Sequence, residues 1–397
     1  MARCAYSSIM LLALLFMQPA FSQDKTKADS SFKPSGKLWG YTFGDFYYKG
    51  HADSLNRGGA NQYTGIEEGR NAFQIRRVYL GYTYEISQSF TAELLLAAED
   101  NITNSSGVTT GDLLGDSKLS LYIKLANLRW KNIWKGTDLV LGQVATPAFP
   151  LLTETIWGYR SIERTVADIR RTPSFDLGAS LQGKFDNKGN FGYNFMIGNG
   201  NGARPENDKY KWFYGDVFAK FLDKRLVFDL YADYVRMNRT GRWHHSHNIV
   251  KGFAAYTTPS FTVGIEAFTN HGNEDNVGIN SAKRDTVSAN SIAVSTYIRG
   301  NIVKEKLGFF LRMDNYNPNI DYHNNLYTSY KGLTANYEPN NKELFFTGGF
   351  DITPVKNVHF MPNVWYNRYT SNMAGQSGRA YRDYDLVFRL TFYYVYR

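Results

Sequence analysis

Two strands with a long segment between them decide the fold of this chain. Residues 139–144 read LVLGQV, and residues 175–185 read FDLGASLQGKF. In the second stretch, the odd positions from 177 to 185 are Leu, Ala, Leu, Gly and Phe, whereas positions 176, 180, 182 and 184 are Asp, Ser, Gln and Lys. This period of two predicts a strand with one apolar and one polar face. The charge-rich segment 145–174 is too long for a hairpin turn, and such long loops are usually either functional or disordered.

The same alternation recurs along the chain and predicts sixteen strands. They are residues 37–48, 73–86, 90–99, 119–130, 139–144, 175–185, 191–197, 212–221, 226–234, 249–257, 261–269, 291–299, 307–314, 344–352, 358–369 and 384–396. In the thirteenth, Leu307, Phe309 and Leu311 share the face that we assign to lipid. Phe310, Arg312 and Asp314 share the face that we assign to a lumen. In the fourth, the alternation slips near Ala126, which predicts a β-bulge.

The connections between these strands alternate in length. The short ones are residues 87–89, 131–137, 186–190, 222–225, 258–260, 300–306 and 353–357, and the long ones are 49–72, 100–118, 145–174, 198–211, 238–248, 270–290, 315–343 and 370–383. Short turns on one rim and long loops on the other are typical of a membrane barrel. We therefore predict an all-β fold, a sixteen-stranded antiparallel transmembrane β-barrel, with a soluble β protein as the alternative. An even count puts both chain ends on the short-turn rim, which would face the periplasm.

Composition agrees with a barrel in a membrane. The chain has 397 residues with 29 Tyr and 27 Phe, and a mean hydropathy of −0.42. Half of each barrel strand is polar, so a low mean hydropathy with many aromatic residues is expected. A barrel of sixteen strands leaves a water-filled lumen. The formal charge of +9 suits anionic solutes or lipopolysaccharide phosphates as well as it suits general solubility. Neither a basic helix nor a zinc spacing points to nucleic acid.

The N-terminus has the pattern of a secretory signal. Arg3 precedes the short apolar run 9–17, and Ala20-Phe21-Ser22 is a small-x-small cleavage site. We expect residues 1–22 to be a signal peptide, 23–36 a periplasmic linker, and 37–397 the barrel. The single cysteine, Cys4, falls in the leader, so the mature chain would hold no disulfide.

Short motifs around the central segment resemble one family. The stretch GQVATP at 142–147 resembles the Gly-Gln-Phe-Lys-x-Pro step of the phosphate-selective porins, the porin O and P type. YRSIER at 159–164, DLG at 176–178 and FQIRRVYL at 73–80 resemble that family's loop, re-entry strand and second strand. The resemblance implies a trimeric sixteen-stranded porin whose third loop folds inward. It also implies an outer-membrane channel for passive diffusion of small solutes, including anions such as phosphate.

The expected lumen wall departs from the family in its charge. The position of the family's lumen lysine is Ala145 here. The cations that we assign to the wall are Arg77, Lys124, Arg129, Lys184, Arg299, Arg312 and Arg389. Carboxylates such as Glu99, Asp229, Glu266 and Asp351 alternate inward with them. A phosphate filter needs clustered cationic donors, so this mixed wall leaves the solute open.

The segment 145–174 holds the densest run of arginines. Its candidate constriction residues are Arg160, Arg164, Arg170, Arg171, Glu154, Glu163 and Asp168. One interpretation is a field across a pore constriction, with arginines facing carboxylates; the other is internal salt bridges that hold the loop in place. Ile162, Val166 and Ile169 share a helical face, which predicts a short helix within 161–170.

Other chemistry has weaker support. Three histidines lie in RWHHSH at 242–247, but no cysteine or carboxylate is near, so we expect a solvated loop and no metal site or cofactor. No Gly-x-Ser-x-Gly occurs, so we expect no enzyme activity. A receptor or adhesin using Tyr316, Tyr322, Tyr327 and Tyr330 of the long loops is the alternative function.

Overall fold

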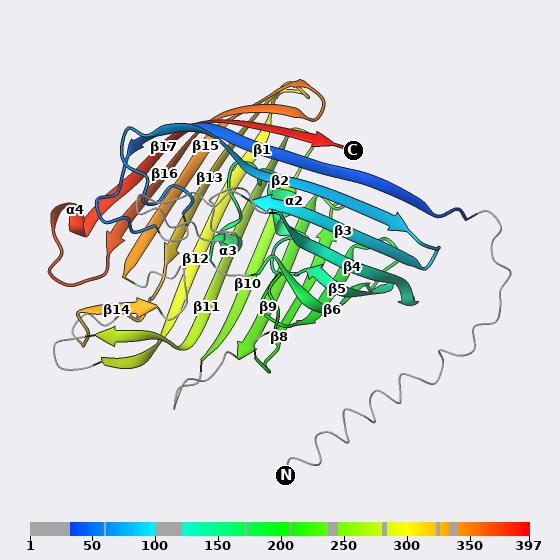
Figure 1. The fold of residues 1–397 in the computed structure, drawn as a ribbon, viewed down its shortest axis with the longest axis horizontal. Helices are drawn as coiled ribbons and strands as arrows, with labels where there is room; N and C mark the ends of the chain where they lie inside the picture. The colour runs from blue at the N-terminus through cyan, green and yellow to red at the C-terminus, as the bar shows by residue number, and fades with distance from the viewer. Residues whose placement is uncertain are drawn as a thin grey trace, which may run out of the picture.

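The computed structural model describes residues 32–58, 61–99, 121–170, 173–206, 208–236, 245–279, 284–322, 326–332 and 340–397. The predicted signal peptide lies outside these residues, as do Arg171 and His244. Within the described ranges, one antiparallel sheet contains seventeen strands. Figure 1 shows them side by side, wrapped into a barrel.

The strands follow one another around the wall in chain order. They are β1 (Ser35–His51), β2 (Asn71–Glu85), β3 (Phe90–Glu99), β4 (Leu121–Trp134), β5 (Thr137–Ala145), β6 (Phe175–Lys184), β7 (Phe191–Gly198), β8 (Trp212–Phe221), β9 (Leu226–Arg236), β10 (Ser246–Thr257), β11 (Phe261–Ile279), β12 (Arg284–Val303), β13 (Leu307–Asn317), β14 (Ser329–Gly332), β15 (Asn341–Val355), β16 (Val358–Ser371) and β17 (Arg382–Tyr396). The short β14 pairs only with β11, and β13 pairs directly with β15, so sixteen of the seventeen form the barrel. β1 pairs with β17, from Gly40 opposite Tyr396 to His51 opposite Leu386.

Closure of the sheet gives hydrogen-bond partners to the strand N–H and C=O groups, which would find none in lipid. The predicted fold class is confirmed: the chain forms a closed sixteen-stranded antiparallel β-barrel. The predicted faces of β13 are also confirmed, because Phe310, Arg312 and Asp314 are buried while Leu311 and Met313 are 44% and 47% exposed.

One predicted loop is wrong. Residues 270–290 were expected to be a long connection, but β11 and β12 continue through most of them to Ile279 and from Arg284. The pairs Asn276–Val287 and Ile279–Arg284 extend the ladder well beyond the strand ends that alternation predicts. The polar residues of 270–279 hid this part of the strand, because they lack the apolar alternation by which the other strands were recognised.

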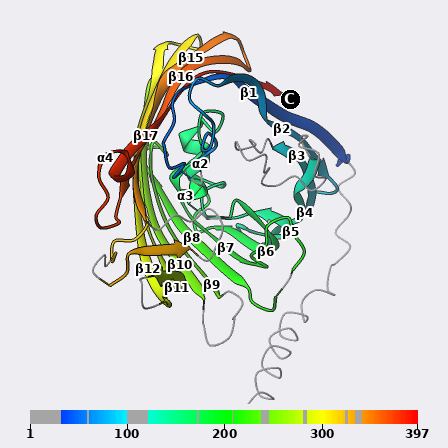
Figure 2. The ribbon, with the colours of Figure 1, turned by 60° about the vertical axis from the view of Figure 1, so that its left-hand side comes forward.

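The segment between β5 and β6 contains two short helices, α2 (Thr153–Trp157) and α3 (Val166–Ile169). We call residues 146–174 the crossing segment. The predicted helix within 161–170 is therefore confirmed in its second half, where Thr165 caps it by accepting a hydrogen bond from the Asp168 amide at 3.4 Å. Figure 2 shows α2 and α3 inside the ring of strands.

Candidate functional site: a charged cluster in the lumen

Two β-bulges add cations to the inner face of the wall. Where β2 pairs with β1, the register shifts between Phe43 and Gly44, so both Arg76 and Arg77 turn inward and are buried. Where β4 pairs with β3, the register shifts between Leu95 and Leu96, which confirms the bulge predicted near Ala126. This second bulge adds Lys124 to the lumen face. A bulge leaves one extra residue on a strand and re-aims its side chain.

Lys124 and Arg77 converge on one carboxylate of the wall. Arg77 lies 2.9 Å from Glu99, and Lys124 lies 2.7 Å from the same side chain. The Tyr79 hydroxyl donates to Glu99 at 2.6 Å. The wall of β2, β3 and β4 thus presents two cations around one partly exposed acid.

The crossing segment has its own charged group. Arg160 forms ion pairs with Asp168 and, at 3.4 Å, with Glu154. Arg164 lies 3.5 Å from Glu163 and 4.0 Å from Asp168. Internal salt bridges were one of the two interpretations of these charges in the sequence. They hold α2 and α3 to the turn between them.

The two groups act on each other electrostatically. Burial disfavours the charged form of Arg160, but Glu154 and Asp168 outweigh it and raise the pKa of that guanidinium, with smaller contributions from Tyr79 and Glu99 of the wall. Burial raises the pKa of Glu154, since Arg160 only partly offsets it and Asp168 adds to it. We call Arg77, Glu99, Lys124, Glu154, Arg160, Arg164, Glu163 and Asp168 the charged cluster. Its segment and wall members approach each other inside the barrel.

Three other arginines of the wall attach the crossing segment from the opposite side. Arg299 donates to the Ile156 carbonyl at 3.1 and 3.0 Å, and Arg389 donates to the Ile162 carbonyl at 2.9 Å. Arg312 donates to the Arg164 carbonyl while pairing with Asp314. We call Arg299, Arg312 and Arg389 the anchor arginines. Each of these guanidinium groups gives at least one N–H to a backbone carbonyl of the segment, which the sequence could not show.

Apolar packing supports the same attachment. Trp157 is buried against Tyr297, with ring centroids 4.9 Å apart, and its indole donates to the Glu163 carbonyl at 2.9 Å. Phe149 and Val166 belong to a buried cluster with Tyr231 and Phe268 of the wall. The Ala167 amide donates to Glu266 at 3.2 Å. The crossing segment therefore contacts strands from β9 to β17.

The remaining candidate residues are placed elsewhere. Arg170 pairs with Glu343 of β15 at 2.6 Å and lies 4.1 Å from the centroid of the Tyr316 ring. Tyr316, expected in a surface loop, is thus buried. Arg129 pairs with Asp138 at 3.0 Å and lines a cavity of about 340 Å³ together with Lys184. These two residues are not in contact with the charged cluster.

Sequence reasoning missed two groups. Arg76 pairs with Asp45 at 2.7 Å and donates to the Ser161 carbonyl, which makes it a further attachment point. His359 lies 2.8 Å from Asp351 across a hairpin. Both residues flank the short connection predicted at 353–357, so hairpin pairing could have indicated their contact. In the described part of the chain, no group of three or more His, Cys, Asp and Glu side chains could hold a metal ion.

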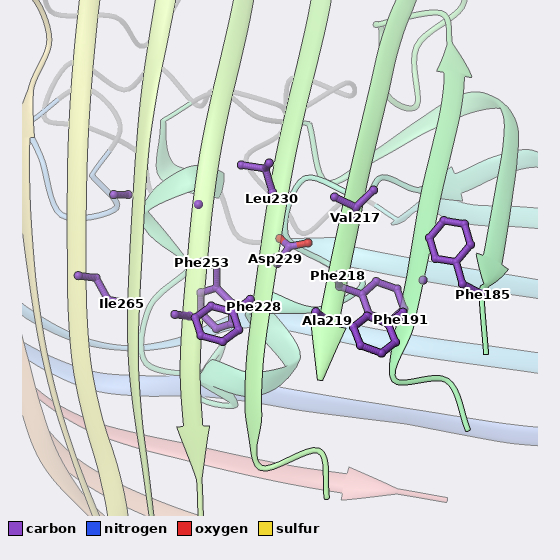
Figure 3. Close-up of a pocket in the computed structure, with 14 residues that line it drawn as sticks. Phe185, Phe191, Val217, Phe218, Ala219, Phe228, Asp229, Leu230, Phe253 and Ile265 are labelled. Carbon is purple, nitrogen blue, oxygen red and sulfur yellow. The ribbon is translucent and has the colours of Figure 1, made fainter. Parts of the chain in front are cut away.

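The outer surface of the barrel is apolar. Outward side chains such as Leu230, Phe213 and Val250 are 56%, 53% and 53% exposed, although they are hydrophobic. Figure 3 shows a hollow on this surface, of about 650 Å³, which we call the outer hollow. An exposed apolar band of this kind fits a hydrocarbon environment. Among the described residues, no helix is both long and apolar enough to cross a membrane.

Several solved structures have the same fold. They include the anion-selective porin from Comamonas acidovorans (11% identity, TM-score 0.58, covering 92% of this chain and 100% of that chain), the outer-membrane channel DcaP of Acinetobacter baumannii (11%, 0.59, 92% and 99%) and the trimer form of OmpT from Vibrio cholerae (10%, 0.55, 92% and 100%). No family model matches the chain, and no curated protein sequence does. The closed barrel and its apolar outer surface identify an integral protein of the outer membrane.

Proposed function

We propose that this chain is a porin, a water-filled channel for passive diffusion of small solutes, in which the crossing segment narrows the lumen. One observation supports this most directly: charges of the segment and charges of the β2–β4 wall approach each other inside a closed barrel. In such a site a polar solute would pass between Arg160 on one side and Glu99 and Lys124 on the other.

The charged cluster favours weak selectivity. Its four cations, Arg77, Lys124, Arg160 and Arg164, are balanced by four carboxylates, Glu99, Glu154, Glu163 and Asp168. A phosphate filter would need an excess of donors at one point. We therefore propose a pore for small solutes of either charge, with at most a slight preference for anions such as phosphate.

The proposal includes assembly and export. The resemblance of the sequence to the phosphate-selective porins and the trimer form of OmpT both favour a homotrimer in lipid and lipopolysaccharide. The leader 1–22 would direct export, and 23–36 would form a periplasmic linker. We propose no catalytic activity.

A planar bilayer with a salt gradient tests the channel. We expect discrete conductance steps with a small reversal potential, because the charged cluster is balanced. Removing residues 155–170 should raise the conductance of each step, since it deletes most of the crossing segment. If protein that is folded, as shown by a gel mobility that changes on boiling, gives no conductance steps, the porin proposal is refuted. If the deletion leaves the conductance unchanged, the constriction lies elsewhere.

A further inference from the structure

The outer hollow lies on the lipid side of the wall, between β6 and β11. Phe185, Phe228 and Leu230 line it and are 69%, 44% and 56% exposed. In β9, Phe228 and Leu230 alternate with the inward and buried Val227, Asp229 and Tyr231, so the two faces are unambiguous. Phe185 and Phe191 flank the short turn between β6 and β7, and Phe228 lies near the start of β9, just after the turn that follows β8; Figure 3 shows the three rings spread across the hollow.

The floor of the outer hollow is made of small outward residues on neighbouring strands. Gly252 and Ala254 of β10 lie beside Ala267 of β11, which pairs with Gly252. A Cβ added at Gly252 would meet nothing within 4 Å. Atoms that line an unfilled space lose dispersion contacts, so a flexible chain that fills it would be favoured.

Basic side chains stand on the turns next to the hollow. Lys188 lies in the turn after β6, and Lys224 in the turn after β8; both are exposed, and the described residues place no carboxylate within 4 Å of either ammonium. Of the acids in these turns, Asp186 accepts the Asn190 and Phe191 amides at 2.7 and 3.0 Å, and Asp223 lies 4.0 Å from Arg225. Asp186 is therefore engaged within its turn, Asp223 is 97% exposed and lies nearest Arg225, and neither acid pairs with Lys188 or Lys224, which leaves the two lysines for another anion.

We propose that the outer hollow binds one anionic phospholipid of the periplasmic leaflet, with an acyl chain over Gly252 and the headgroup phosphate at Lys188 and Lys224. Bulk lipid tails are as apolar as the hollow, so hydrophobicity alone selects nothing there. The preference for one bound lipid comes from the fit of its acyl chain to the outer hollow and from the lysines on the turns. Each lysine contributes about a fivefold preference for an anionic headgroup. This binding is independent of conduction through the lumen.

Native mass spectrometry of the detergent-solubilised full-length protein tests the proposal. Phosphatidylglycerol and phosphatidylethanolamine with identical acyl chains are titrated separately. The parent should retain phosphatidylglycerol in preference. The variant Lys188→Gln/Lys224→Gln should lose that preference by roughly tenfold or more. Its matched control is Lys304→Gln/Lys306→Gln, in the turn between β12 and β13.

A second variant tests the shape. Gly252→Leu should reduce retention of both lipids, and Val294→Leu, also outward but outside the hollow, should not.

Equal retention of the two lipids by the parent, or equal effects of Gly252→Leu and Val294→Leu, would show only a general lipid shell and overturn the site. A change in oligomeric state without lost lipid would instead assign the hollow to a contact between copies. If Gly252→Leu does not fold, the turn variants still decide. Conductance steps from the same samples report on the porin separately.

Discussion

Arginines lie on both sides of the crossing segment, but their surroundings differ. Arg312 and Arg389 are 2% and 4% exposed, and each donates one hydrogen bond to a backbone carbonyl of the segment. Arg160 remains partly exposed, with 15% of its side chain accessible, and faces wall residues as well as its own carboxylates. The same residue type therefore fixes the segment on one side and, in the proposed porin, faces the solute path on the other. A cation inside a barrel does not by itself indicate selectivity.

The largest effect is expected from an anchor. Arg312→Ala would leave Asp314 buried without its partner and free the Arg164 carbonyl. Breaking a buried ion pair in this way costs roughly 3–5 kcal/mol. Urea unfolding in detergent, followed by tryptophan fluorescence, measures it. The paired replacement Arg312→Met/Asp314→Leu removes both charges and should cost less. Equal losses in the two variants would mean that the ion pair is not the source of the effect.

The neighbouring residue sharpens the contrast between the two faces of one strand. Leu311 points outward beside Arg312, so Leu311→Arg should destabilise the barrel by about 2–4 kcal/mol if it lies near the bilayer midplane. The conductance of the folded fraction should not change, because the substitution lies outside the lumen. Refolding yield into lipid vesicles measures the first effect. A change in ion preference without a loss of stability would contradict the assigned face.

The charged cluster should affect ion selectivity, which the anchor arginines should not. Replacing Arg77 and Arg160 together with Gln removes two of four cations from the charged cluster. A charge pair in a water-filled space is worth about 1 kcal/mol at 4 Å, so the anion-to-cation permeability ratio should fall about fivefold. Reversal potential in a salt gradient gives this ratio. The control Arg129→Gln removes a lumen cation outside the cluster and should shift the ratio less.

The alternation of apolar and polar residues predicted the strands of the wall well, because one face of each strand must be apolar to contact lipid. Leu311 and Arg312 could be assigned to opposite faces from their neighbours alone. The bulge that points Lys124 inward was visible as a slip in phase, whereas the bulge at Arg76 was not, because Arg76 and Arg77 are both polar. Contacts of the anchors could not be predicted at all. Arg312 meets a backbone carbonyl 148 positions away, and every residue has such a carbonyl, so the sequence contains no signal for that choice.

The smallest expected effect is a pH dependence that separates the two sides of the crossing segment. Burial raises the pKa of Glu154 above its ordinary value, and Arg160 compensates only in part. As the pH falls from 7, Glu154 therefore takes up a proton earlier than an exposed glutamate would, and the cluster loses one negative charge. Anion preference should rise over this range. Because the raised pKa favours the protonated folded state, the same change should slightly stabilise the protein.

The variant Glu154→Gln should abolish the pH dependence of the reversal potential. At pH 7 it should already show the anion preference that the parent shows at acid pH. Glu163 supplies the control. Burial alone would raise its pKa, but Arg164 and Arg389 outweigh the burial and lower the pKa, so Glu163 stays ionised over this range. Glu163→Gln should leave the pH dependence in place. A parent whose reversal potential is constant between pH 7 and 5 would show that Glu154 does not face the solute path.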